Sequence, residues 1–350
     1  MRLRALGKGM SALIDTGTAR TWAVSTMPTG PKVSTDEAQA VAAELSELAA
    51  RSQELVRAAT GLSAGSEHLV VIADRATWID SNIRALDVMT AGFDPNTSAP
   101  VRAVGSRMTA ANIGAALGWL SGHVLGQYEA TEEQGRLLLV APNLVRTEQQ
   151  LGVDPSGFRL WVCLHEETHR VQFGAVPWLR SYFLDTVRVV LEPRELNGMA
   201  GLRQIGSVLN HVFDVVRTNA DFDLALIAPH EDQREAINRI LALMTVLEGH
   251  ADVIMDIAGA GYVNELDEIR QRFEIRRDTA RDHHRILRKL LGLDTKLRQY
   301  REGAAFIRAI LDRGGMDAVN ALWESPQSLP MLAEIPDPDS WWARVVRRAA

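Results

Sequence analysis

The run HEETH at residues 165–169 limits the structures open to this 350-residue chain more than any other part of the sequence. Positions i and i+4 of an α-helix share a face, so His165 and His169 can reach one metal ion if the run is helical. Glu166 would then lie beside the open side of the ion, where a base takes the proton of a zinc-bound water. Glu167 would project from another side of the helix. The run therefore predicts a Zn2+ site with two histidine ligands and Glu166 as the catalytic base.

The residues before this run favour a buried helix. An apolar segment, FRLWVCL at 158–164, leads directly into it, and Asp154 or Ser156 in the preceding turn can cap the helix. A buried helix that carries two histidines and two glutamates is unfavourable without a ligand. We expect the helix to end near Gly174, and we interpret Cys163 as a small buried hydrophobe. The alternative is that hydrogen bonds alone satisfy both histidines.

A catalytic zinc site needs a third protein ligand and an open position for water. We expect that ligand in a helix at about 231–258, where Glu248 and Asp252 are four residues apart and face the same way. Glu248 would bind the metal, and Asp252 would hold a ligand imidazole through its other nitrogen. His250 is the rival ligand, but it lies about 200° around the helix from Glu248, so the two cannot both point at one ion. Glu248 is favoured because it alone pairs with Asp252, on an otherwise apolar face where an unpaired carboxylate is disfavoured.

Two tyrosines and one strand are candidates for a role beside the metal. A tetrahedral oxyanion generally needs a hydrogen-bond donor besides the metal, and Tyr262 or Tyr300 could supply it. The alternative is that each is an ordinary half-buried tyrosine. The apolar strand expected at 137–141 could form a sheet edge that pairs with an extended peptide. An ordinary core strand is the favoured interpretation.

The spacing of apolar residues predicts far more helix than strand. Ser34 and Glu37 have the spacing of a capping box and begin a helix that reaches about Thr60. The first 33 residues are expected to be loosely ordered at first, and the final RVVRRAA is expected to form a short amphipathic tail. Further helices are expected at about 77–91, 178–191, 198–217, 265–291, 295–312 and 316–323, with short strands at 68–73 and 137–141. The expected class is mainly α (α+β), a helical core with a small β-sheet.

The length and composition fit one large domain or two closely packed ones: an N-terminal helical region at 1–130 and a catalytic region at 131–350. The net charge of −6 gives no sign of the basic face that nucleic-acid binding needs. Cys163 is the single cysteine, which excludes an internal disulfide, and residues 1–22 lack an apolar run of signal-peptide length. We therefore expect a cytoplasmic protein with no nucleic-acid partner.

Residues 109–128 come closest in length to a membrane span, but polar residues interrupt them, which is unfavourable in lipid. Four glycines recur at every fourth position and would form one smooth stripe on a helix: Gly114, Gly118, Gly122 and Gly126. We therefore expect no membrane span, but a buried helix that a second helix or strand approaches closely along the stripe.

Several segments together are similar to a known family. The segments HEETHRVQF, VPWLRSYF and LEGHADVIMD resemble those of the actinobacterial zincin-like hydrolases and zinc-dependent metalloproteases. The resemblance covers nearly the whole chain and includes DRATWIDSN, GWLSGHVLGQYE, LLLVAPN, ESPQSLP and KLRQYREG. One branch of that family is named for an association with biosynthesis of a deazaflavin coenzyme.

The resemblance implies a zincin-like core in which H-E-x-x-H and E-x-x-x-D lie on two helices that meet at the metal. Glu248 and Asp252 fit the second pattern, which implies a glutamate as third ligand. The interval between His169 and Glu248 is longer than in the best-known peptidases.

Together these features favour a zinc-dependent hydrolase, and among hydrolases a metallopeptidase that acts on a peptide or protein. One alternative is a zinc hydrolase of a non-peptide amide or ester. The other is a non-catalytic protein that zinc stabilises and that acts by binding partners, because no sequence feature specifies a substrate pocket or an oligomeric state.

Overall fold

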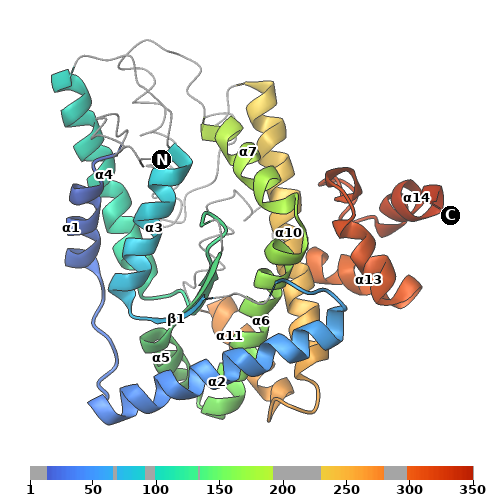
Figure 1. The fold of residues 1–350 in the computed structure, drawn as a ribbon, viewed down its shortest axis with the longest axis horizontal. Coiled ribbons are helices and arrows are strands. Elements are labelled where there is room, and N and C mark those ends of the chain that lie inside the picture. The colour runs from blue at the N-terminus through green and yellow to red at the C-terminus, as the bar shows by residue number, and fades with distance from the viewer. Residues whose placement is uncertain are drawn as a thin grey trace, which may run out of the picture.

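Three short strands form one mixed sheet in a mostly helical chain (Figure 1). In this computed structural model, which describes residues 14–65, 69–90, 99–132, 135–191, 230–279 and 298–349, the strand order is β1-β3-β2. β1 (Leu69–Ala73) runs parallel to β3 (Arg136–Val140), and β2 (Gly126–Tyr128) runs antiparallel to β3 on its other side. The core-strand interpretation of 137–141 is confirmed, since β3 is central and β2 is an edge strand.

The side chains of β3 alternate between two hydrophobic clusters because successive residues of a strand point to opposite faces. Leu139 packs into a cluster with α2, α5 and α6, whereas Leu138 and Val140 pack into one with α1, α3 and α4. These helices span Thr16–Thr26 (α1), Thr35–Thr60 (α2), Arg75–Thr90 (α3), Ala99–Ser121 (α4), Ala141–Leu151 (α5) and Pro155–Ala175 (α6). The mainly α (α+β) fold is therefore confirmed.

A further group of helices follows α6 in the sequence. It comprises α7 (Leu179–Leu191), α10 (Glu231–Gly259), α11 (Leu266–Thr279), α13 (Arg298–Asn320), two 3-10 turns (Ala321–Trp323 and Pro326–Ser328) and α14 (Pro338–Ala349). α10 contributes Leu243 and Val246 to the cluster shared with α7 and α13, and Ile254 and Met255 to the cluster shared with α6. In Figure 1, α13 and α14 lie on the opposite side of the molecule from α1 and α4.

Two helices were not expected from the sequence. The early chain was expected to be loosely ordered, but Asp15 accepts a hydrogen bond from the Thr18 backbone N–H and begins α1. Pro142 was expected only to close the strand, yet it lies in the first turn of α5, where a missing N–H is tolerated.

The glycine-striped helix ends at Ser121 instead of near residue 128. The Asn143 side chain donates hydrogen bonds to the backbone carbonyls of Ser121, the last residue of the helix, and of Val124, which follows it. The Ser121 carbonyl therefore has a partner although the helix does not continue. Gly114 and Gly118 lie against α1, where a Cβ atom would collide with the backbone oxygens of Ala19 and Ala23. The predicted close approach of a second helix is confirmed for these two glycines.

Local features set two further helix limits. The capping box at Ser34 and Glu37 is present, and Gly315, with φ 67°, interrupts the helical backbone between the two helices expected at 295–312 and 316–323. The helix expected at 198–217 and the end of the one expected at 265–291 lie outside the described residues. The boundary at 130/131 falls between β2 and β3, so strands from both regions share the sheet.

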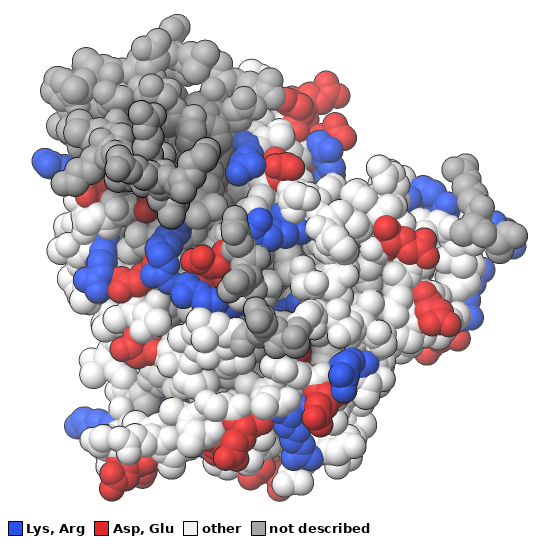
Figure 2. All heavy atoms as spheres, viewed as in Figure 1, with Lys and Arg blue, Asp and Glu red and all other residues white. Residues whose placement is uncertain are grey.

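The described part of the chain has no helix that combines the length and apolar character needed to cross a bilayer, as expected. On the face shown in Figure 2, basic and acidic side chains are interspersed. That mixture differs from the continuous basic face that nucleic-acid binding needs.

Candidate metal centre

Two helices bring three possible ligands together. The run at 165–169 is helical within α6, which Asp154 caps by accepting a hydrogen bond from the Gly157 N–H, and Glu248 lies on α10. His165 Nε2 lies 3.6 Å from Glu248 Oε2, and His169 Nε2 lies 3.7 Å from Glu248 Oε1. The two Nε2 atoms are 3.1 Å apart. We name His165, His169 and Glu248 the metal cluster.

The chemistry of the metal cluster fits a zinc ion. Two imidazole nitrogens and one carboxylate oxygen are a common donor set of catalytic zinc sites, and here all three lie within 4.8 Å of one another. The side chains are between 13% and 17% exposed, so the cluster is partly shielded but open to solvent. One ion could therefore contact all three groups and keep a position for another ligand.

Glu166 is buried beside the metal cluster and against strand β2. A Cβ atom on Gly126 would lie 2.6 Å from Glu166 Cδ and 2.8 Å from Glu166 Oε1, so only glycine leaves room for this carboxylate. Burial raises the pKa of Glu166 to about 7, and the charge of Glu248 adds to the effect against the opposing charge of His165. A carboxyl group with such a pKa can both accept and donate a proton near neutral pH.

The two histidines of the cluster differ in protonation. Burial opposes the charged form of His165, but the hydrogen bond and charge of Glu248 outweigh it and raise the pKa to about 9. Burial and the charge of His165 together lower the pKa of His169 against the influence of Glu248. Without a metal, His165 is therefore the protonated member of the pair at neutral pH.

Gln172 contacts His169 from the side away from Glu248. Gln172 Oε1 lies 2.9 Å from His169 Nδ1, and Gln172 Nε2 donates to the Leu247 carbonyl at 2.9 Å. The same nitrogen lies 3.0 Å from Nδ1 of His250, which is fully buried and is not part of the metal cluster. Gln172 was not predicted from the sequence. A polar residue three positions after His169, on the same face of a buried helix, was the available signal.

Asp252 lies one turn after Glu248 and accepts a hydrogen bond from Arg270 at 2.9 Å. Its charge is among those that raise the pKa of His165. Its expected role, holding a ligand imidazole, stays a prediction for His165. For His169, Gln172 occupies that position.

The remaining candidates are Glu167, Cys163 and two tyrosines. Glu167 is buried and accepts a hydrogen bond from Arg170 at 2.6 Å, while Cys163 is a buried free thiol, as expected.

Tyr262 follows the end of α10, is 51% exposed and lies under the Arg51 guanidinium. Eleven helical residues, about 16 Å, separate Glu248 from that end of α10. The side chain of Tyr300 lies outside the described residues.

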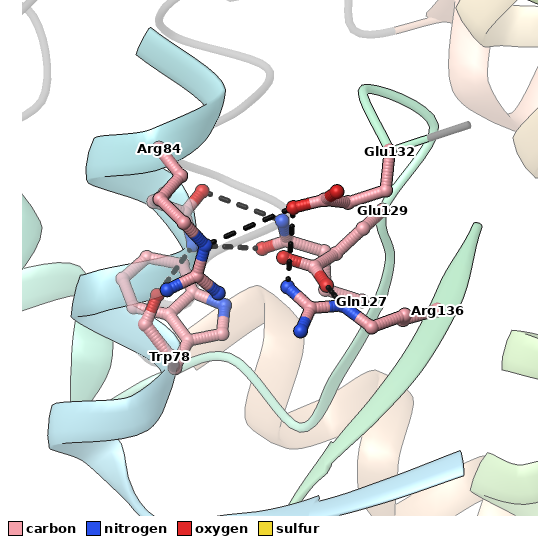
Figure 3. A network of polar contacts seen from close by, with 7 residues as sticks. Trp78, Arg84, Gln127, Glu129, Glu132 and Arg136 are labelled. Carbon is pink, nitrogen blue, oxygen red and sulfur yellow. Dashed lines mark hydrogen bonds and ion pairs between the residues drawn. The ribbon is translucent and has the colours of Figure 1, made fainter. Parts of the chain in front are cut away.

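A network of polar contacts connects β2 with α3 and β3 (Figure 3). Asn82 of α3 and Gln127 of β2 exchange hydrogen bonds at 3.2 and 3.3 Å, and Arg136 of β3 pairs with Glu129 at 2.6 Å. Arg180 of α7 donates hydrogen bonds to the backbone carbonyls of Ala130 and Thr131. β2 and the residues that follow it are thus attached to α3 and to α7.

Comparisons with known proteins agree with this geometry. The crystal structure of a candidate hydrolase with a novel fold from Chloroflexus aurantiacus matches with a TM-score of 0.65 and 27% identity, over 96% of this chain and 99% of that chain. No curated protein sequence matches the chain. A family model described as zincin-like metallopeptidase matches residues 14–342, a range that contains both helices of the metal cluster. This chain therefore belongs to the zincin-like metallopeptidase family.

Proposed function

We propose that the chain is a zinc-dependent hydrolase that cleaves peptide bonds, with His165, His169 and Glu248 holding the metal and Glu166 moving the proton. The observation that supports this most is the convergence of two imidazoles and a carboxylate from two helices beside a buried glutamic acid. Membership of a metallopeptidase family supports the same conclusion.

A zinc ion in such a donor set supplies a Lewis acid that polarises a carbonyl and makes water a better nucleophile at neutral pH. Glu166 accepts one proton from the attacking water as the water oxygen bonds to the carbonyl carbon. Glu166 then donates that proton to the amide nitrogen as the C–N bond breaks, which leaves an amine and a carboxylic acid. In the metal-free protein burial raises the pKa of Glu166 to about 7, in the range where a carboxyl group can both accept and donate a proton.

The position of β2 supports a peptide as substrate. Within the described residues, β2 pairs with β3 on one side, and its backbone lies against Glu166 at Gly126. An extended peptide can add to an edge strand through main-chain hydrogen bonds. A peptide bound there would pass close to the catalytic carboxyl group.

The test combines metal analysis with an unbiased peptide-library digest. Purified protein should contain about one zinc per chain, and Glu166→Gln should keep the zinc but lower kcat by at least about 100-fold. Glu334→Gln is the control: it changes another buried carboxylate, which pairs with Arg344, and should retain activity. Retained turnover in Glu166→Gln would refute the proposed mechanism.

The same experiment separates the other functions. Cleavage of esters or non-peptide amides with all peptides left intact would indicate another zinc hydrolase. A native protein that binds zinc, cleaves none of these substrates, and unfolds on His165→Ala would instead be a zinc-stabilised binding protein. Membership of the branch named for deazaflavin coenzyme biosynthesis and the cytoplasmic location stay predictions.

A further inference from the structure

The amide of Gln172 has one orientation that satisfies its neighbours. The backbone oxygen of Leu247 can only accept a hydrogen bond, so the Gln172 atom 2.9 Å from it must be the NH2 nitrogen. The other amide atom, Oε1, then faces His169 Nδ1 at 2.9 Å. Because Oε1 can only accept, His169 must carry its proton on Nδ1.

His250 agrees with this orientation. Its Nδ1 lies 3.0 Å from the Gln172 nitrogen and therefore accepts the second amide N–H. The proton of His250 is then on Nε2, a buried atom with no conventional hydrogen-bond partner among the described residues. The His250 ring makes a T-shaped contact with the Trp323 indole, with centroids 5.4 Å apart. Both amide protons of Gln172 thus have acceptors.

We infer that Gln172 is a positioning residue that holds His169 in the Nδ1–H tautomer and so leaves its Nε2 lone pair facing His165 and Glu248. The distance of 3.1 Å between the two histidine Nε2 atoms agrees, because a lone pair on His169 can accept the proton of His165 there. The conclusion that this lone pair binds a metal rests on the proposed function. The tautomer of His169 follows from the hydrogen bonds of Gln172 alone.

The consequence for metal binding follows from the chemistry of imidazole. In water the Nε2–H tautomer of histidine is the more populated one, and it has no lone pair on the side that faces the cluster. A hydrogen-bond acceptor at Nδ1 reverses that preference and increases the basicity of the ligand nitrogen. Gln172 is fully buried, so water does not compete for this hydrogen bond.

The first measurement is the tautomer of His169 in the metal-free protein. Nitrogen NMR of histidine-labelled protein at pH 8, with the His169 signal assigned by its loss in His169→Gln, should show Nδ1 protonated in the native chain. Gln172→Leu should move His169 towards the Nε2–H tautomer, whereas Gln172→Glu, which keeps an acceptor, should retain Nδ1–H. An Nε2–H tautomer in the native protein would overturn the inference, even if neither variant folds.

The second measurement is zinc affinity by chelator competition. Gln172→Leu should weaken zinc binding by about 10- to 100-fold, and Gln172→Glu should restore most of the loss. Gln233→Leu is the matched control. Gln233 is also buried on a helix and donates to a backbone carbonyl, that of Val190, but it lies four turns from Glu248.

The outcomes separate the two proposals. Native tautomer and native zinc affinity in Gln172→Leu would overturn the inference and leave the proposed function standing. The expected tautomer shift in a protein that hydrolyses no substrate would support the inference and count against the proposed function.

Discussion

The space beside Glu166 is set by a residue that has no side chain. Gly126 does not need unusual backbone angles, since it lies in strand β2, but any Cβ atom there would overlap the Glu166 carboxyl group. The glycine therefore determines how closely the edge strand approaches the Glu166 carboxylate. A displacement of about 1 Å at such a group can lower the rate by about two orders of magnitude.

We expect Gly126→Ala to retain zinc and to lower kcat by about 100-fold, because the new methyl group displaces the Glu166 carboxyl group. Steady-state kinetics and metal analysis on the same preparation would check this. Gly65→Ala is the control, since a Cβ atom at Gly65 meets nothing within 4 Å. An unchanged kcat in Gly126→Ala would show that the carboxyl group does not need its present position.

Zinc affinity should depend on pH through His165. Burial opposes its charge, but Glu248 raises its pKa to about 9, so the metal-free centre holds a proton that zinc must displace. The affinity should rise about tenfold per pH unit between about pH 7 and about pH 9, and then level off. Chelator competition at several pH values, with proton release measured by calorimetry, would test this. Constant affinity over that range would place the proton elsewhere.

The metal cluster illustrates how much of the site a sequence can predict. His165, Glu166 and His169 follow from one helical turn, and the structure brings Glu248 to them as the pairing with Asp252 suggested. Gln172 and Gly126 were missed, because their importance arises only where α6 meets α10 and β2. The spacing of residues along a helix predicts which side chains share a face. The contacts of Gln172 and Gly126 depend on tertiary packing, which that spacing does not specify.

At the scale of elements, α1 and α4 pack more closely than ordinary side chains allow. Gly114 and Gly118 let the backbone of α1 approach α4, and a Cβ at either position would overlap an α1 carbonyl oxygen. Neither helix can move away freely, because the hydrophobic cluster that contains Ala19 and Ala23 also contains Ile113 and Leu117.

We expect Gly118→Ala to lower the free energy of unfolding by about 1–3 kcal/mol, since the added methyl group forces the two helices apart. Gly17→Ala on α1, where a Cβ atom would have only an ordinary contact with Asp15, should leave stability unchanged or raise it by up to about 1 kcal/mol. Urea denaturation would measure both changes. Equal stability of the two variants would contradict the close packing of α1 and α4.

Helix limits show which elements were predictable. The capping box fixed the start of α2 correctly, because Ser34 and Glu37 satisfy the helix N-terminus without help from distant residues. The end of α4 depends on Asn143, which lies 22 residues further along the chain than Ser121, and this contact was not visible in the local pattern. The start of α2 could therefore be predicted and the end of α4 could not, while α1 was missed although its cap, Asp15, is also local.

At the scale of the whole molecule, α10 joins two hydrophobic clusters and carries one member of the metal cluster. Its residues Leu243 and Val246 pack with α7 and α13, while Ile254 and Met255 pack with α6. A metal that bridges α6 and α10 would therefore stabilise the contact between these parts of the core. Binding to the folded state alone raises its stability.

Zinc removal should consequently lower Tm. At a free zinc concentration of about 1,000 times Kd, binding adds about 4 kcal/mol to the free energy of unfolding. Differential scanning calorimetry with a chelator, and then with zinc restored, would measure the change. The Tm of His165→Ala should respond little to either treatment. An identical Tm for native protein with and without zinc would contradict a site that spans the two helices.

The single thiol, Cys163, can be used to measure the exposure of α6, the helix that carries His165 and His169. Burial, followed by the charges of Glu166 and Glu167, raises the pKa of Cys163, which lies two residues before His165. The reactive thiolate is therefore scarce and shielded while α6 stays in the core. Since the chain has no other cysteine, the rate of alkylation would report how often this helix is exposed to solvent.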